Sequence, residues 1–406
     1  MPPDDPAAGT DESHALRSLR KRSLVWLFIG WVMVVCNILL LMTEVPSGQQ
    51  WALIVVPASG MLAFWMFLYT HLHTNRRVRD RRLLPRFGLG NAISIFRGLE
   101  VILLAGYLFI PRPQNWTAWI PALLYTSADI LDYMDGYAAR VRNEVTQLGE
   151  ELDQLFDGAG LLIASLLAIR YGALPWWLLP FGAARYLFLF GLWIRRKRGL
   201  AVFPLSESRI RRPIAGLTMG FMTAMLWPIV QPPASLIAGL IFMLPFGASF
   251  LRDWFVVSGV IDPQSVRYLE LRDWLEKLLI RYFPVGLRLG LAALLGVDVW
   301  ITMRDLDTQV ALFNAAGFPA PQVIVLLFTI LKLVALPFLV MGAAGRFAAF
   351  LLIFPIGLAS VSVGLNGVRT GLLIADLLIL ILGTGMYSVW EPSRKIFGRR
   401  PGGTDE

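Results

Sequence analysis

The chain has little charge, one cysteine and three histidines in 406 residues. Charged residues make up 16% of the sequence and hydrophobic residues 56%, whereas soluble domains carry about 25% charged residues. The single cysteine, Cys36, excludes a disulfide scaffold. His71 and His73 are two residues apart and so face different sides of a helix, which argues against a histidine metal site. We therefore predict an all-α, multipass membrane protein.

Long, mostly apolar segments indicate about 12 transmembrane helices, because a spanning helix needs about 20 mostly apolar residues. The first two segments, Ser23–Thr43 and Trp51–Thr70, contain no charged residue. The other predicted spans lie near residues 92–111, 117–139, 150–170, 174–194, 213–230, 234–251, 284–302, 322–343, 347–366 and 371–388.

The distribution of basic residues predicts the orientation of these spans. Lysine and arginine outnumber aspartate and glutamate by 37 to 28, giving a net charge of +9. They gather after even-numbered spans, as at residues 76–82, 195–198 and 394–400. Because basic loops stay on the cytoplasmic side, we expect cytoplasmic tails at 1–22 and 391–406 in the inner or plasma membrane. Basic residues scattered along one membrane face do not predict a nucleic-acid partner.

Four aspartates mark the strongest candidate site, because acidic residues inside a span are costly and usually functional. Asp132 and Asp135 lie near the end of the fourth predicted span, and Asp153 and Asp157 near the start of the fifth. A short connection makes these helices antiparallel neighbours, so the four carboxylates should converge near the cytoplasmic surface. A cation would relieve their repulsion. Oxygen ligands suit Mg²⁺, Mn²⁺ or Ca²⁺ better than zinc, and Mg²⁺ keeps positions open for substrate phosphates.

Neighbouring residues fit a phosphate-bearing substrate. Gly136 and Ala139 are small residues on the same helix face, and Arg140 can donate two hydrogen bonds to a phosphate. These features predict metal-assisted phosphoryl transfer. Asp129 lies one turn deeper on this face, either supporting the site or taking no part in it.

The full pattern Asp132-x2-Asp135-Gly136-x2-Ala139-Arg140-x8-Gly149-x3-Asp153-x3-Asp157 resembles the signature of the CDP-alcohol phosphatidyltransferases. The resemblance covers roughly residues 88–255, and Asn91–Arg97 is similar to the family's lead-in to its first span. It implies a six-helix core in which an alcohol attacks the β-phosphorus of a CDP-linked substrate and releases CMP.

The resemblance also implies roles for individual residues. Asp157 would be the catalytic base, with a share in metal binding. The Mg²⁺ or Mn²⁺ ligands would be Asp132, Asp135 and Asp153. The CDP-binding residues would be Asn91, Asp132, Gly136, Ala139, Arg140 and Gly149. Members of the family are often dimeric, so a homodimer is one expected assembly.

The acceptor is less defined by the sequence. Arg185 lies within the sixth predicted span, and Arg209, Arg211 and Arg212 form a basic loop after it. These arginines are candidate ligands of an acidic acceptor, such as a glycerol or sugar phosphate. The alternative is that the loop only sets the topology and attracts anionic lipid.

Segments outside the core carry weaker signals. Residues 23–75 are predicted to form two N-terminal spans, and 256–283 an interfacial linker helix. Residues 284–390 are predicted to form a four-helix membrane unit that resembles the DoxX-like proteins. The alternative functions of this unit are to bind a quinone, to bind a lipid or to dock a partner. Lys332 and Asp376 within this unit could pair.

Two classes of function follow. The first is an enzyme of phospholipid synthesis that takes CDP-diacylglycerol, a small alcohol and membrane lipids as partners; a variant uses a soluble CDP-alcohol and a lipid acceptor. The second is a membrane scaffold or redox-associated subunit without catalytic activity. The intact eight-residue pattern favours the enzyme.

Overall fold

The computed structural model describes residues 6–205, 211–232, 234–315, 318, 320–363, 367–383, 385–386 and 388–389. Throughout these ranges the protein is helical and forms no strand; pairing of extended residues is limited to two isolated bridges, Arg76–Leu83 and Arg77–Thr146. The all-α prediction is confirmed. The chain divides into two compact units, one of residues 1–198 and 214–250 and the other of residues 199–213 and 251–406.

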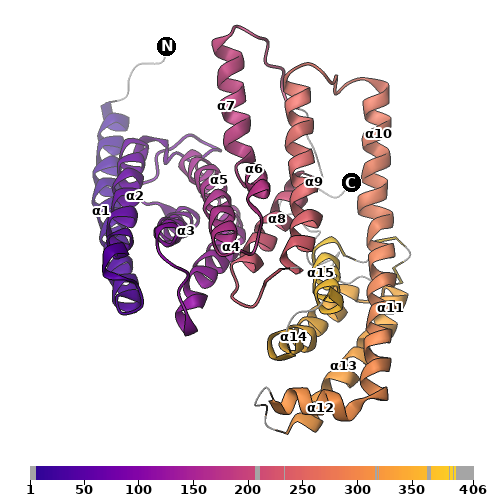
Figure 1. Cartoon of the computed structure of the whole chain (residues 1–406). Coiled ribbons are helices and arrows are strands. Elements are labelled where there is room, and N and C mark those ends of the chain that lie inside the picture. Colours follow the sequence, from indigo (N-terminus) through magenta and orange to yellow (C-terminus); the bar gives the residue numbers. More distant parts are fainter. Residues whose placement is uncertain are drawn as a thin grey trace. The chain divides into compact units, whose positions relative to one another are not determined.

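The first unit contains the N-terminal helices and most of the family-like region (Figure 1). Its helices are α1 (Pro6–Leu41), α2 (Trp51–Thr70), α3 (Gly88–Gly106), α4 (Trp119–Val141), α5 (Gln147–Arg170), α6 (Leu179–Gly182) and α7 (Ala184–Lys197), with most of α8 (Arg211–Met225) and α9 (Ala234–Val257).

Helix α3 lies at the centre of this unit, between the α1–α2 pair and the α4–α5 pair (Figure 1). In lipid, helices associate through close van der Waals packing, which small residues permit. A Cβ atom at Gly90 would lie 2.8 Å from the Ala139 Cβ of α4, and one at Gly98 would lie 2.1 Å from the Phe156 ring of α5. These glycines let α3 approach both helices that carry the aspartates.

The loop between α2 and α3 is anchored to the α4–α5 connection. The buried Asn75 side chain donates to the Leu84 and Arg86 carbonyls, both at 2.9 Å. The Val78 amide donates to the Val145 carbonyl, and the Gln147 amide to the Arg76 carbonyl. A segment of the chain that precedes the family-like region therefore holds the start of α5 in place.

The second unit is built around four helices, α11, α13, α14 and α15. Its elements are α10 (Val266–Glu276), a π-helical stretch (Lys277–Tyr282), α11 (Phe283–Arg304), α12 (Leu306–Ala315), α13 (Pro321–Met341), α14 (Gly345–Val363) and α15 (Gly367–Leu382). Lys332 pairs with Asp298 of α11 at 2.6 Å and not with Asp376, so the suggested Lys332–Asp376 pair is wrong. Asp298 lies 34 residues away in sequence, and only the packing of α13 on α11 brings it close.

Each of the twelve predicted spans corresponds to helical structure, but not every helix is long and apolar enough to cross a membrane. Within the described chain, seven helices meet that condition, or eight if α6 and α7, which meet at a 64° bend, form one span. Helix α4 carries three aspartates, and the apolar stretch of α8 is short. The count of about 12 is therefore not confirmed, whereas the integral membrane character is.

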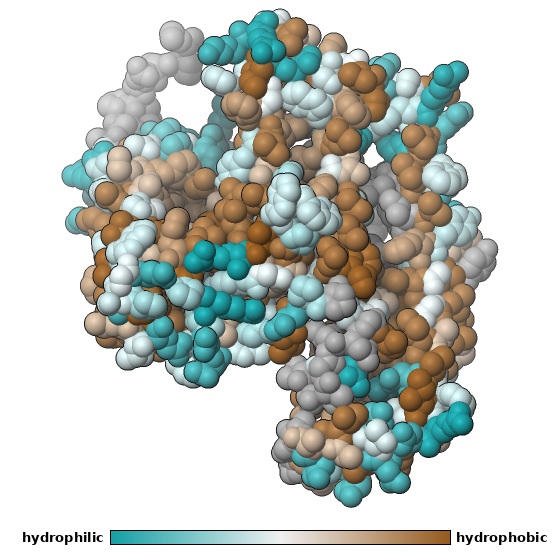
Figure 2. Space-filling model, viewed as in Figure 1, coloured by the Kyte–Doolittle hydropathy of each residue, from teal (hydrophilic) through white to brown (hydrophobic). Residues whose placement is uncertain are grey.

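Hydrophobic side chains are exposed on many of these helices, as expected for surfaces that face lipid (Figure 2). Phe28 and Leu39 of α1 are about two-thirds exposed, and so are Phe347 and Phe350 of α14. Such exposure would be a liability in water. It is the normal state of a membrane-embedded helix surface.

Candidate metal and phosphoryl-transfer site

The candidate site forms where α4 ends and α5 begins. Asn143, with a φ of 53°, follows the end of α4 and reverses the chain direction. Thr146 then caps α5, because its hydroxyl oxygen accepts a hydrogen bond from the Gly149 amide at 3.1 Å. This short connection sets the two helices antiparallel.

Three of the four predicted metal ligands lie together. One carboxylate oxygen from each of Asp132, Asp135 and Asp153 lies within 4.8 Å of the other two. Asp135 is buried, and its carboxylate accepts a hydrogen bond of 2.7 Å from the Ser94 hydroxyl of α3. Asp157 is not one of this group within the described chain. The oxygen donors fit a hard divalent cation such as Mg²⁺ or Mn²⁺, and their mutual repulsion is what such a cation would relieve.

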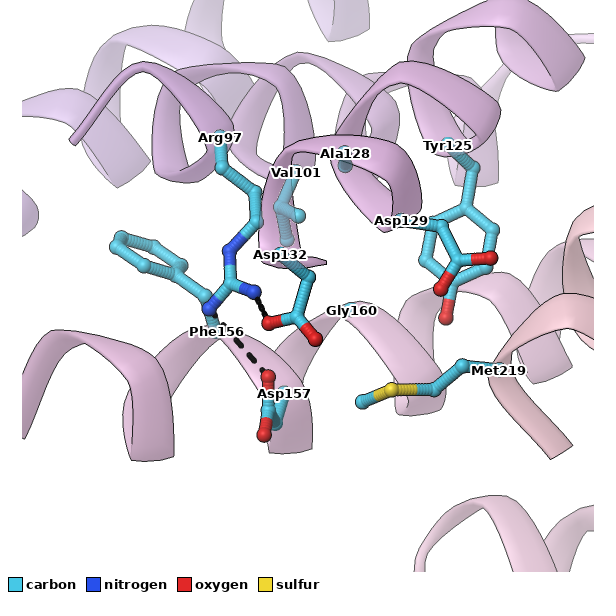
Figure 3. A pocket seen from close by; sticks show the side chains of 10 residues that line it. All are labelled: Arg97, Val101, Tyr125, Ala128, Asp129, Asp132, Phe156, Asp157, Gly160 and Met219. Atoms are coloured by element: carbon cyan, nitrogen blue, oxygen red, sulfur yellow. Dashed lines mark ion pairs between the residues drawn. The ribbon is translucent and has the colours of Figure 1, made fainter. Parts of the chain in front are cut away.

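Arg97 of α3 is the main site residue that the sequence reasoning missed. Its buried guanidinium pairs with Asp132, with Asp153 at 3.2 Å and with Asp157 at 3.3 Å. Figure 3 shows the Arg97 side chain reaching between Asp132 and Asp157. The sequence did contain a signal, since Arg97 and Glu100 are the only charged residues of α3. This one arginine contacts three of the four acids.

The predicted CDP-binding residues fall into two sets. Gly136 and Arg140 lie next to each other, since a Cβ atom at Gly136 would be 3.0 Å from Arg140 Nη1. Asp132 belongs to the carboxylate group, and Ala139 packs against Gly90.

The second set lies within the scaffold. Asn91 is buried, and its amide nitrogen lies 2.8 Å from both Asn75 Oδ1 and Thr146 Oγ1. Gly149 packs so closely against Asn91 that an added Cβ atom would be 2.5 Å from its Oδ1. Asn91 and Gly149 therefore join α3 to the start of α5.

The predicted acceptor-binding arginines are only partly described. Arg185 lies beside α5, where its Nη2 donates to Gln154 Oε1 at 3.4 Å and its Cδ approaches Gly158. Arg209 lies outside the described residues. Arg211 and Arg212 begin α8, and their side chains are outside the described part of the chain.

A small, partly open cavity lies beside the aspartates (Figure 3). Its polar lining consists of Arg97, Tyr125, Asp129, Asp132 and Asp157. Its remaining lining residues are Val101, Ala128, Phe156, Gly160 and Met219. The cavity thus places a small space next to both the carboxylate group and Asp157.

Residues 87–256 match the family model described as CDP-alcohol phosphatidyltransferase. This region is a CDP-alcohol phosphatidyltransferase domain. The domain begins just before α3, ends within α9, and contains all of the motif aspartates. The family is divalent-metal dependent, in agreement with the group formed by Asp132, Asp135 and Asp153.

Curated relatives match part of this chain. A CDP-diacylglycerol–glycerol-3-phosphate 3-phosphatidyltransferase of Cereibacter sphaeroides is 33% identical over 75 residues, which are 18% of this chain and 33% of the relative. Proteins of the same name from Salmonella choleraesuis and Escherichia coli strain K12 are 28% and 29% identical over 95 and 96 residues, each covering 23% of this chain and 51% of the relative. The chain thus spans between a third and a half of these relatives. No solved structure matches it.

Proposed function

We propose that this protein transfers a phosphatidyl group from CDP-diacylglycerol to a small polar alcohol and releases CMP. The observation that supports this most directly is the approach of Asp132, Asp135 and Asp153 to within 4.8 Å inside a CDP-alcohol phosphatidyltransferase domain. The relatives named as glycerol-3-phosphate 3-phosphatidyltransferases make CDP-diacylglycerol the favoured donor. Phospholipid synthesis is the process to which this reaction belongs.

In the proposed reaction the acceptor oxygen forms a bond to the β-phosphorus, and the bond between that phosphorus and the oxygen bridging to CMP breaks. CMP leaves with the bonding electron pair. Asp157 takes the proton of the acceptor hydroxyl, because it lines the cavity and lies next to the metal-ligand group. A divalent cation held by Asp132, Asp135 and Asp153 would neutralise diphosphate charge. Arg140, beside Gly136, is placed to donate to a phosphate oxygen.

Arg97 holds the carboxylates in position for this chemistry. Its guanidinium contacts both Asp157 and two of the proposed ligands, so one buried side chain fixes the base relative to the metal group. Preorganised charges of this kind contribute to catalysis because they need no rearrangement during the reaction.

The reaction is tested by measuring CMP release from CDP-diacylglycerol in liposomes that contain the purified protein and Mg²⁺ or Mn²⁺. Asp157→Asn is the inactive variant, and Glu150→Gln, at an exposed position in the first turn of α5, is the matched charge control. Metal-dependent release that the control retains and Asp157→Asn loses supports the proposal. CMP release only from a soluble CDP-alcohol with diacylglycerol would show that the lipid is the acceptor and not the donor. No CMP release with either substrate pair would favour a membrane scaffold without catalytic activity.

We also propose that the site and both termini face the cytoplasm, because the loops near the site are rich in arginine. The two ends of α4 allow a direct test in a Cys36→Ala background. A cysteine at the exposed Arg142 should react with a membrane-impermeant maleimide only from the cytoplasmic side. A cysteine at the exposed Gln114, near the other end, should react only from outside. The opposite labelling would invert the topology.

A further inference from the structure

Asp129 is an acidic residue of the cavity that the proposed reaction does not use. It lies one helical turn deeper in α4 than Asp132, on the same side of the helix. Its carboxylate accepts a hydrogen bond of 3.2 Å from the Thr223 hydroxyl of α8. Among the described residues it has no ion pair, in contrast to Asp132 and Asp157, which both contact Arg97. A carboxylate without a paired cation inside a membrane domain costs folding free energy, so its presence indicates a function.

Tyr125 gives a second, independent indication of a ligand. The residue is 5% exposed and lines the same cavity, yet its hydroxyl makes no hydrogen bond to any part of the chain that is described. Buried tyrosine hydroxyls usually have a partner. Figure 3 shows the Tyr125 hydroxyl and the Asp129 carboxylate directed to the same side, towards Met219 of α8.

The charges around the cavity restrict what it can hold. Its titratable lining comprises Asp129, Asp132, Asp157, Tyr125 and Arg97. Arg97 already contacts three carboxylates, so it has little capacity for a further anion. Arg185 contacts Gln154 and is not part of the lining. A phosphate placed beside Asp129 would meet its negative charge, and among the described lining residues no further arginine is present to offset it. The proposed divalent cation is assigned to the donor diphosphate. Like charges brought together oppose binding.

We propose that Asp129 and Tyr125 form an acceptor subsite that selects an uncharged polyhydroxy alcohol over its phosphorylated form. One hydroxyl of the acceptor donates to Asp129, another accepts from Tyr125, and the reacting hydroxyl faces Asp157. The cavity places both of these polar groups beside Asp157. This inference rests on the proposed function, and it differs from the acidic acceptor that the basic loop suggested.

The test compares matched acceptor pairs, glycerol with glycerol 3-phosphate and inositol with inositol phosphate, in the CMP-release assay. We expect kcat/KM to be at least about tenfold higher for each uncharged member. Asp129→Asn keeps the size of the side chain and removes its charge, so it should reduce this preference. Tyr125→Phe should raise KM for the polyol about fivefold with little change in kcat, because it removes one hydrogen bond. Glu150→Gln is again the charge control.

Several outcomes would overturn the subsite. These are a preference for the phosphorylated acceptors, for an amino alcohol such as ethanolamine, or for diacylglycerol, and an unchanged preference in Asp129→Asn. Equilibrium binding of tritiated inositol, with CMP and Mg²⁺ present, distinguishes failure of the subsite from failure of the proposed reaction. Binding that Tyr125→Phe weakens and inositol phosphate does not displace supports the subsite even without turnover. Absence of binding overturns it.

Discussion

Arg97 Nη2 lies 3.3 Å from Asp157 Oδ1, so a residue of α3 holds the carboxylate that we assign as the base on α5. The same guanidinium contacts Asp132 and Asp153. Three acidic residues on two helices thus share one buried cation from a third helix. The arrangement joins the stability of the domain to the geometry of its site.

Replacing Arg97 with Met should therefore impair both properties. Removal of the cation leaves three neighbouring carboxylates uncompensated, which should cost about 3 kcal/mol of folding free energy. Added Mg²⁺ should restore stability to a greater extent in Arg97→Met than in the wild type, because the freed carboxylates become available to the ion. Thermal unfolding in detergent, with and without Mg²⁺, measures this. Equal unfolding temperatures for the two proteins in metal-free buffer would contradict it.

Substitutions should distinguish the aspartate that acts as the base from those that bind the metal. Asp157→Asn should lower turnover by about 10²–10⁴-fold and leave the metal concentration for half-maximal activity close to that of the wild type. Asp132→Ala should raise that concentration. Chelation should abolish activity, and Mg²⁺ or Mn²⁺ should restore it. The base assignment fails if Asp157→Asn keeps more than about a tenth of the rate, and the ligand assignment fails if Asp132→Ala shows wild-type metal dependence.

Gly149 should tolerate no side chain, because an added Cβ atom would lie 2.5 Å from Asn91 Oδ1. Gly149→Ala should displace Asn91 from Thr146 and lower stability by about 1–2 kcal/mol, as overpacking does, with a loss of activity. Gly48→Ala is the control, because a Cβ atom there would meet no described atom within 4 Å and Gly48 does not have a positive φ. If Asn91→Ala, combined with Gly149→Ala, did not restore part of the lost stability, the steric explanation would be wrong.

Lys332 and Asp298 should stabilise the second unit through an energetic coupling between the two side chains. Lys332→Met leaves Asp298 without its partner inside a membrane helix and should cost about 3 kcal/mol. The double variant Lys332→Met/Asp298→Leu should recover most of this loss, because neither charge remains. A double-mutant cycle of unfolding free energies measures the coupling. Additive effects of the two substitutions would show that the pair is not coupled.

Asp376 should be a site where an apolar residue stabilises the protein. It is fully buried in α15, and in the described part of the chain neither carboxylate oxygen has a hydrogen-bond partner. Asp376→Leu keeps the branching and the number of non-hydrogen atoms of the side chain and removes the unsatisfied polar group, so we expect a gain of about 1 kcal/mol. Asp376→Asn, which stays polar, should gain less. A loss of stability in Asp376→Leu would mean that the carboxylate has a stabilising partner.

The sequence by itself determined the helical class, the positions of the helices and the local geometry of the site. Helical periodicity relates residues three or four apart, which is why Asp132 and Asp135 could be placed on one face of α4. The short connection to α5 then brought Asp153 beside them. The aspartate spacing also indicated the family, and the match of residues 87–256 confirmed it.

Only the tertiary structure decided which distant residues meet. Arg97 reaches the aspartates because Gly90 and Gly98 let α3 pack closely on α4 and α5. Thr223 donates a hydrogen bond to Asp129, which is 94 residues away in sequence. Lys332 pairs with Asp298 and not with Asp376. Such contacts depend on how helices cross and rotate against each other. The spacing of residues along a single helix contains no information about that packing.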